Sequence, residues 1–187
     1  MTTRYERNRN PRWLLAGSPG DFQVENFDRI LCNGDLTALA TGVMRSVAIP
    51  FEAGDVVTNL TFKSGATAAD TPLNWWFALY SMASTPALLA QTADQTTTAW
   101  AANTVMTKAL ATPQTIPTTG VYYAAIMMKA TTPCTLLGRD VGIAGASASI
   151  LSSKILAQTS GSTLTDTAPS TVATPTTSDL IPLVIAT

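Results

Sequence analysis

The sequence predicts an all-β protein: an antiparallel, jelly-roll-like β-sandwich of about eight strands with an extended N-terminal arm. Three observations favour this fold class. Apolar and polar residues alternate with a period of two after residue 42, turn-forming residues separate the alternating runs, and no run has the 3.6-residue period of a long helix. The 187 residues, 46% of them hydrophobic and 12% charged, are enough to bury the core of one domain.

We expect residues 1–42 to form the arm and residues 43–187 to form the sandwich domain. The first twelve residues have little periodic pattern, and Pro11 with the neighbouring asparagines disfavours a helix. Residues 16–21 have the composition of a turn. Apolar residues return between Phe22 and Leu31 in sufficient number to dock the arm on this domain or on a neighbouring subunit.

Eight short runs after residue 42 have the alternation or the apolar composition of strands. The expected strands span 43–49, 56–63, 74–82, 87–92, 104–110, 121–129, 154–159 and 180–186. The runs 74–82 and 121–129 are nearly all apolar, which indicates central strands covered on both faces. Prolines at 113, 117 and 182 favour edge positions. Residues 160–179 are rich in Thr, Ser and Pro, so we expect a long irregular loop, while 142–153 fit a short helix or a loop.

The sequence contains no histidine, which excludes the Ser-His-Asp and Cys-His nucleophile systems and all histidine-containing zinc sites. It has no phosphate-binding, dinucleotide-binding or EF-hand motif, so we expect no cofactor and no metal. Cys32 and Cys134 match no metal or redox spacing, and we expect each to be a small buried residue, with a disulfide between them left open.

Most of the acidic residues fall in predicted turns, where a carboxylate usually accepts hydrogen bonds from backbone N–H groups. These residues are Asp35, Glu52, Asp55, Asp70, Asp94, Asp140, Asp166 and Asp179. A glycoside hydrolase that uses two of them is therefore the least favoured functional class. The net charge of -1 and the pI near 5.2 predict no specific nucleic-acid binding and no attraction to anionic membranes.

The aromatic residues are the stronger candidates for a contact surface. Trp75 and Trp76 are adjacent, so in a strand they point to opposite faces. We expect one of them in the core, and the other against a covering arm, a partner subunit or a ligand. Trp100 lies in a polar loop, where it would stack on a sugar, anchor an interface or fold back over the sandwich. Tyr122 and Tyr123 follow a Thr-Thr-Gly turn, which favours a hydroxyl that pins a sandwich corner.

The N-terminal segment combines basic residues with a short apolar run, a composition typical of protein interfaces. It is open to two interpretations: a solvated tail, or an anchor that binds other proteins, which we favour. The expected partner-binding residues are Arg4, Arg7, Arg9, Arg12, Trp13, Leu14 and Leu15. No apolar stretch as long as the core of a signal peptide follows these charges, so we expect no signal peptide and synthesis in the cytoplasm.

Several sequence blocks resemble structural proteins of tailed phages that infect actinobacteria. They are the runs 21–27, 31–36, 53–62, 74–80, 89–94, 99–103 and 120–129. The resemblance covers most of residues 21–138 and weakens over residues 160–179. It implies a β-sandwich displayed on the particle, in a family labelled as minor tail or virion proteins with no assigned activity.

The residues and the resemblance together predict a non-enzymatic virion protein that decorates the capsid or tail and binds other virion proteins through its arm. We expect a homo-oligomer, preferably a trimer, that is assembled in the host cytoplasm and carried in the virion. The alternative is a carbohydrate-binding module that recognises host glycans through Trp100 and an exposed Trp75 or Trp76.

Overall fold

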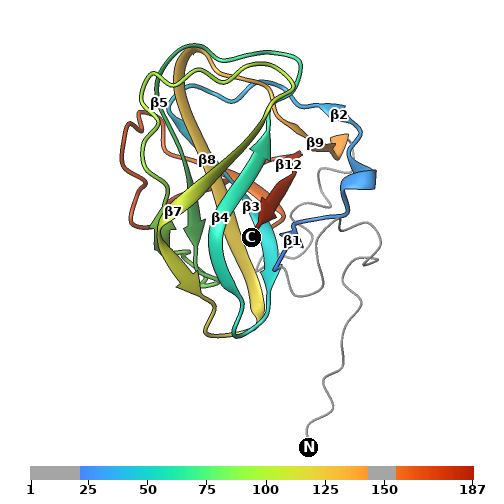
Figure 1. Ribbon diagram of the computed structural model, residues 1–187, viewed down its shortest axis with the longest axis vertical. Helices are drawn as coiled ribbons and strands as arrows, with labels where there is room; N and C mark the ends of the chain where they lie inside the picture. Colours follow the sequence, from blue (N-terminus) through green and yellow to red (C-terminus); the bar gives the residue numbers. More distant parts are fainter. Residues whose placement is uncertain (1–21, 143–154) are drawn as a thin grey trace, which may run out of the picture.

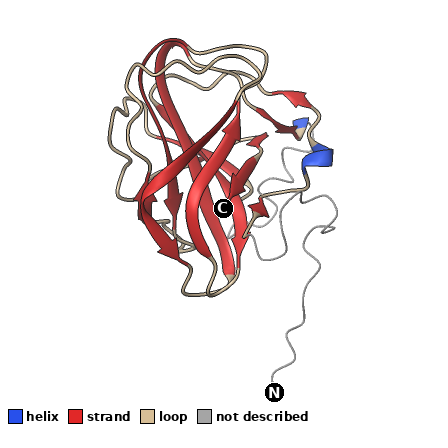
Figure 2. Ribbon diagram, in the orientation of Figure 1, coloured by secondary structure: helices blue, strands red, loops and turns tan. Residues whose placement is uncertain are grey.

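The computed structural model describes residues 22–142 and 155–187, and these residues form an antiparallel β-sandwich (Figures 1 and 2). They include a short 3₁₀ turn, η2 (Arg29–Leu31). Within the described residues there is no helix that is both long and apolar enough to cross a membrane.

A six-stranded sheet forms one layer, in the order β11-β10-β3-β8-β5-β6. Its long strands are β3 (Val43–Phe51), β5 (Asp70–Tyr80) and β8 (Gly120–Thr132). The shorter strands β6 (Leu88–Gln91), β10 (Ala157–Ser160) and β11 (Thr176–Thr177) lie at its two sides. Strand β8 lies between β3 and β5, so the two most apolar strands are central, as the sequence predicts.

The opposite layer consists of two smaller sheets. The four-stranded sheet has the order β1-β13-β4-β7 and contains β1 (Val24–Glu25), β13 (Val184–Ala186), β4 (Val56–Lys63) and β7 (Val105–Thr115). The three-stranded sheet has the order β12-β9-β2 and contains β12 (Leu180–Pro182), β9 (Leu137–Asp140) and β2 (Gly34–Asp35). In Figure 1, β4 and β7 cross in front of β8 and β5.

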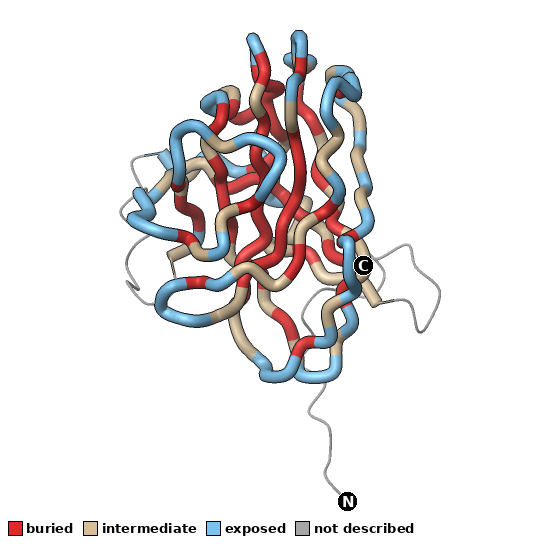
Figure 3. The backbone as a smooth tube through the Cα atoms, turned by 90° about the vertical axis from the view of Figure 1, so that its left-hand side faces the viewer, coloured by how far each residue is buried: buried red, intermediate tan, exposed pale blue. Residues whose placement is uncertain are grey.

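The six-stranded sheet is buried on both faces. Toward the opposite layer, side chains such as Phe51, Trp75 and Ile126 form the main core together with Phe62 and Val184. On the other face, Met44, Trp76, Tyr80, Met127 and their neighbours form a second core beneath Ala168 and Val172. Figure 3 shows the resulting pattern, with buried strands inside a rim of exposed loops. Burial on both faces explains why β5 and β8 read as continuous apolar runs.

All eight expected strands are present, with ends that differ by a few residues. The expected last strand is divided into β12 and β13 at Leu183, because its two halves join different sheets. Strands β7 and β12, which contain Pro113 and Pro182, are edge strands as predicted. The all-β sandwich is confirmed, whereas the finer jelly-roll assignment stays a prediction.

Residues 22–42 belong to the sandwich, so the expected boundary after residue 42 is wrong for this stretch. Strand β1 pairs with β13, and β2 pairs with β9. Leu36 and Leu39 are buried, and the ring of Phe22 lies 6.3 Å from that of Phe51. The burial of these side chains stabilises the packing of residues 22–42 on the sandwich.

The predicted tyrosine corner is confirmed at Tyr122. Its hydroxyl donates to the backbone oxygen of Thr118 at 2.9 Å, across the turn that precedes β8. Tyr80 makes a comparable bond on the other face of the sheet, where its hydroxyl donates to the backbone oxygen of Pro169 at 2.9 Å. Burial raises the pKa of Tyr80 well above its ordinary value.

Candidate functional site

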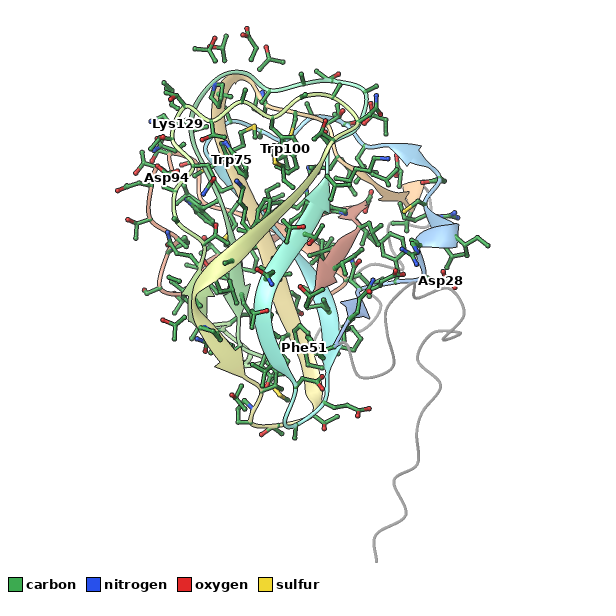
Figure 4. All side chains as sticks on the ribbon, in the orientation of Figure 1. Asp28, Phe51, Trp75, Asp94, Trp100 and Lys129 are labelled. Atoms are coloured by element: carbon green, nitrogen blue, oxygen red, sulfur yellow. The ribbon has the colours of Figure 1, made fainter. Side chains whose placement is uncertain are left out.

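Trp75 and Trp100 are part of an aromatic cluster inside one end of the main core (Figure 4). Their ring centroids are 5.0 Å apart, and Phe77 lies 5.7 Å from each of them. Both indole N–H groups have backbone acceptors: Trp75 donates to Thr98 at 2.8 Å and Trp100 donates to Thr104 at 3.0 Å. The ammonium group of Lys108 lies 5.1 Å from the centre of the Trp75 ring, within reach of a cation–π interaction.

Trp76 points to the opposite face of β5, as its position next to Trp75 predicts. There the irregular segment 161–175 covers it, and its indole N–H donates to the backbone oxygen of Thr165 at 2.7 Å. The same segment binds Gln91, whose amide donates to Asp166 and accepts from the backbone N–H of Ala168. The Thr/Ser/Pro-rich stretch thus covers the second core.

The interpretation of the three tryptophans as surface contacts is wrong for this structure. Trp75, Trp76 and Trp100 are all fully buried, and each indole N–H has an internal acceptor. A sugar needs an accessible ring face on which to stack. These residues therefore act as core side chains, and they offer no surface to a glycan or to another subunit.

Several turn carboxylates hold backbone N–H groups, as predicted. Asp35 accepts from Ala66 at 3.0 Å, Asp55 from Glu52 at 2.7 Å and Asp140 from Gly142 at 2.8 Å. Asp94 accepts from the backbone of Trp75 and from the side chain of Asn74, at 3.0 and 2.6 Å. No group of three or more Cys, Asp and Glu residues suited to a metal ion occurs within 22–142 and 155–187.

Arg45 is a buried cation on β3 that sequence reasoning did not single out. Its side chain is 8% exposed, and among the described residues no acceptor bonds its Nε or Nη1. Desolvation by burial lowers the pKa of this guanidinium. The alternation of β3 could have located Arg45 on the same face as Val47, but only the fold reveals that this face is enclosed.

Both cysteines are free thiols, so the structure has no disulfide between Cys32 and Cys134. Cys134 is buried in the main core, as expected, whereas Cys32 is only half-buried at the end of η2. Burial, followed by the charge of Glu25, raises the pKa of Cys32. Burial is also the largest of the effects that raise the pKa of Cys134, from its ordinary value of 9.0 to about 12.

We expect the buried thiol to make the fold sensitive to alkali. The pKa of Cys134 is higher in the folded state than in the unfolded state. The stabilising contribution of this thiol is therefore complete below pH 9 and is lost as the pH rises toward 12. Between these limits the free energy of unfolding should fall by about 1.4 kcal/mol per pH unit from this group alone. Urea unfolding at about pH 8 and about pH 10.5 measures the loss.

The Cys134→Ala variant should be less stable at neutral pH but should lose less stability between the two pH values. Tyr80 is still present in this variant, and burial raises its pKa as well. It therefore supplies part of the loss of stability at high pH. Equal pH dependence in the wild type and in Cys134→Ala would contradict the assignment to this thiol.

A pocket of about 270 Å³ on the described surface offers a candidate contact site. Its lining comes from elements that are distant in sequence: Asn26, Phe27, Leu31, Ala48, Arg139, Leu156 and Ile181. Leu31 and Leu156 are 54% and 42% exposed, and Ile30, which precedes Leu31 in the chain, is also exposed. No local sequence signal predicts this pocket, because it forms only when β3, β9, β12 and η2 come together.

The polar members of the lining are already engaged. The Asn26 side chain donates to the backbone oxygen of Pro182 and accepts from the backbone N–H of Val184, both at 3.0 Å. Arg139 donates through Nη1 to the backbone oxygen of Leu31 at 3.2 Å. Nearby, Glu25 and Arg29 form an ion pair at 3.3 Å. The remaining surface is suited to an apolar group.

The predicted partner-binding residues of the N-terminal segment lie outside the described residues. Arg4, Arg7, Arg9, Arg12, Trp13, Leu14 and Leu15 therefore remain a sequence-based prediction. The sequence matches no protein-family model and no curated protein.

Proposed function

We propose that this chain is a non-enzymatic structural protein of a bacteriophage particle. In this proposal a β-sandwich decorates the capsid or the tail, and the N-terminal segment anchors it to other virion proteins. The observation that carries the proposal is that the turn carboxylates and the tryptophans have structural roles. The turn carboxylates bind backbone N–H groups, and Trp75, Trp76 and Trp100 fill the two cores.

The resemblance of residues 21–138 to phage structural proteins supports the same assignment. A virion subunit acts by folding stably and by contacting its neighbours, which agrees with a central sheet buried on both faces. We further propose that the protein assembles as a homo-oligomer, preferably a trimer, in the host cytoplasm and remains in the virion. We do not propose glycan recognition, because the tryptophans that would bind the glycan are buried.

Removal of residues 1–21 tests the anchor. This truncation keeps β1, β2, Leu36 and Leu39, so the shortened chain retains every described element of the sandwich. We expect the truncated protein to fold and to be absent from purified particles, whereas the complete chain is incorporated. Circular dichroism measures the fold, and immunoblotting of purified particles measures incorporation.

Two matched variants separate the charged from the apolar part of the segment. One replaces Arg4, Arg7, Arg9 and Arg12 by glutamine, and the other replaces Trp13, Leu14 and Leu15 by serine. We expect both to reduce incorporation, because interfaces combine arginine with aromatic anchors. Normal incorporation of the folded truncation would refute the anchoring role, and absence of the complete chain from particles would refute the virion assignment.

A further inference from the structure

We propose that the pocket beside η2 binds the apolar run Trp13-Leu14-Leu15 of the same chain. In the isolated protein, the N-terminal segment would thus fold back on its own sandwich. This inference goes beyond the proposed function, and it concerns the isolated subunit rather than the particle.

The pocket and its margin leave an apolar surface uncovered among the described residues. Phe27, Leu31, Ala48, Leu156 and Ile181 supply an almost wholly apolar wall. Two of the six exposed large hydrophobic residues of the described chain, Leu31 and Leu156, line this pocket, and a third, Ile30, directly precedes Leu31 in the chain. Covering such a group removes apolar area from water at roughly 25 cal/mol per Å².

The size of the pocket fits a side chain. Its volume of about 270 Å³ leaves room for a large side chain. The Asn26 side chain and Nη1 of Arg139 already have protein partners, so an incoming group need not supply hydrogen bonds to these atoms. An indole or a pair of leucine side chains has the required apolar character.

The covalent connection keeps an apolar run of residues 1–21 within reach of the pocket. Residues 1–21 join the described chain at Phe22, and the next few residues lead through β1 to the lining residues Asn26 and Phe27. Trp13 precedes Phe22 by nine positions, and nine residues reach up to about 30 Å when extended. A short tether of this kind raises the effective concentration of the apolar run at the pocket to the millimolar range. Among residues 1–21, the only run of consecutive large apolar residues is Trp13-Leu14-Leu15.

The charges around the pocket are compatible with a basic segment. Asp28 lies at the N-terminus of η2 beside the lining residue Phe27, where its carboxylate accepts from the backbone N–H of Ile30 at 3.2 Å. Asp179 lies two positions before the lining residue Ile181 in the chain and is exposed. Together with Arg139, these carboxylates give the pocket and its chain neighbours both signs of charge.

Trp13 provides a direct test, because the other three tryptophans are fully buried. The fluorescence emission of the wild type minus that of Trp13→Phe is the emission of Trp13 alone. This component reports the surroundings of Trp13 in the intact chain. We expect this component to be blue-shifted and poorly quenched by acrylamide. Leu31→Asp should shift it to the red and increase its quenching several-fold.

Leu73→Asp is the matched control, because Leu73 is 51% exposed, much as Leu31 is at 54%, but does not line the pocket. It should leave the Trp13 emission unchanged, and circular dichroism should show both aspartate variants folded. Strong quenching of Trp13 in the wild type would overturn the proposal. Protection that disappears on dilution would also overturn it, because the apolar run would then occupy a second copy.

Discussion

Replacing Trp100 by alanine is expected to lower the free energy of unfolding by about 3–5 kcal/mol, the usual range for a large aromatic side chain in a core. The side chain is fully buried against Trp75 and Phe77, with ring centroids 5.0 and 5.7 Å away. Alanine would leave a cavity between these rings and would remove the indole bond to the backbone oxygen of Thr104, which keeps its donors from Ser64. Urea unfolding followed by circular dichroism measures the change.

Trp100→Phe is the control that separates packing from hydrogen bonding. Phenylalanine keeps an aromatic ring in the cluster but loses the N–H group, so we expect a loss of about 1–2 kcal/mol. A surface tryptophan that binds a ligand would give the opposite pattern, with stability nearly unchanged in both variants. Equal stability of the wild type and Trp100→Ala would therefore contradict the core assignment.

The sandwich could be predicted because its determinants are local. Alternation with period two, and turn residues such as Gly54 and Gly120, mark β3, β4 and β8 without any knowledge of the fold. The unbroken apolar runs of β5 and β8 even indicate that their sheet is covered twice. The short strands β1, β2 and β9 escaped prediction, because two to four residues carry no measurable period.

The burial of particular side chains could not be predicted, because it depends on segments that are distant in sequence. Trp76 is buried by residues around Thr165, and Trp100 by Trp75 and Phe77. A polar loop around Trp100 suggests exposure, but the backbone of that loop supplies the acceptor that the buried indole needs. The pocket beside η2 could not be predicted for the same reason, since its lining residues extend from Asn26 to Ile181 in the sequence.

Replacing Arg45 by methionine is expected to raise the free energy of unfolding by about 1–3 kcal/mol. Arg45 is 8% exposed, and within the described chain its Nε and Nη1 have no acceptor. A buried ion costs several kcal/mol in lost hydration unless a partner offsets that cost, and an apolar side chain of similar length avoids it. Methionine also adapts to irregular space, which limits the loss of packing where the guanidinium lay.

The sign of the effect distinguishes this arginine from an ordinary one. Arg139→Met removes an exposed side chain that donates to Leu31, so it should leave stability unchanged or slightly lower it. Only Arg45→Met should shift the midpoint of urea unfolding upward. A decrease of 2 kcal/mol or more would contradict the prediction, because such a loss requires an acceptor for the guanidinium. A stabilising outcome would show that the fold tolerates Arg45 rather than depends on it, since β3 is held by its pairing with β8 and β10 and by Val47, Ile49 and Phe51 in the core.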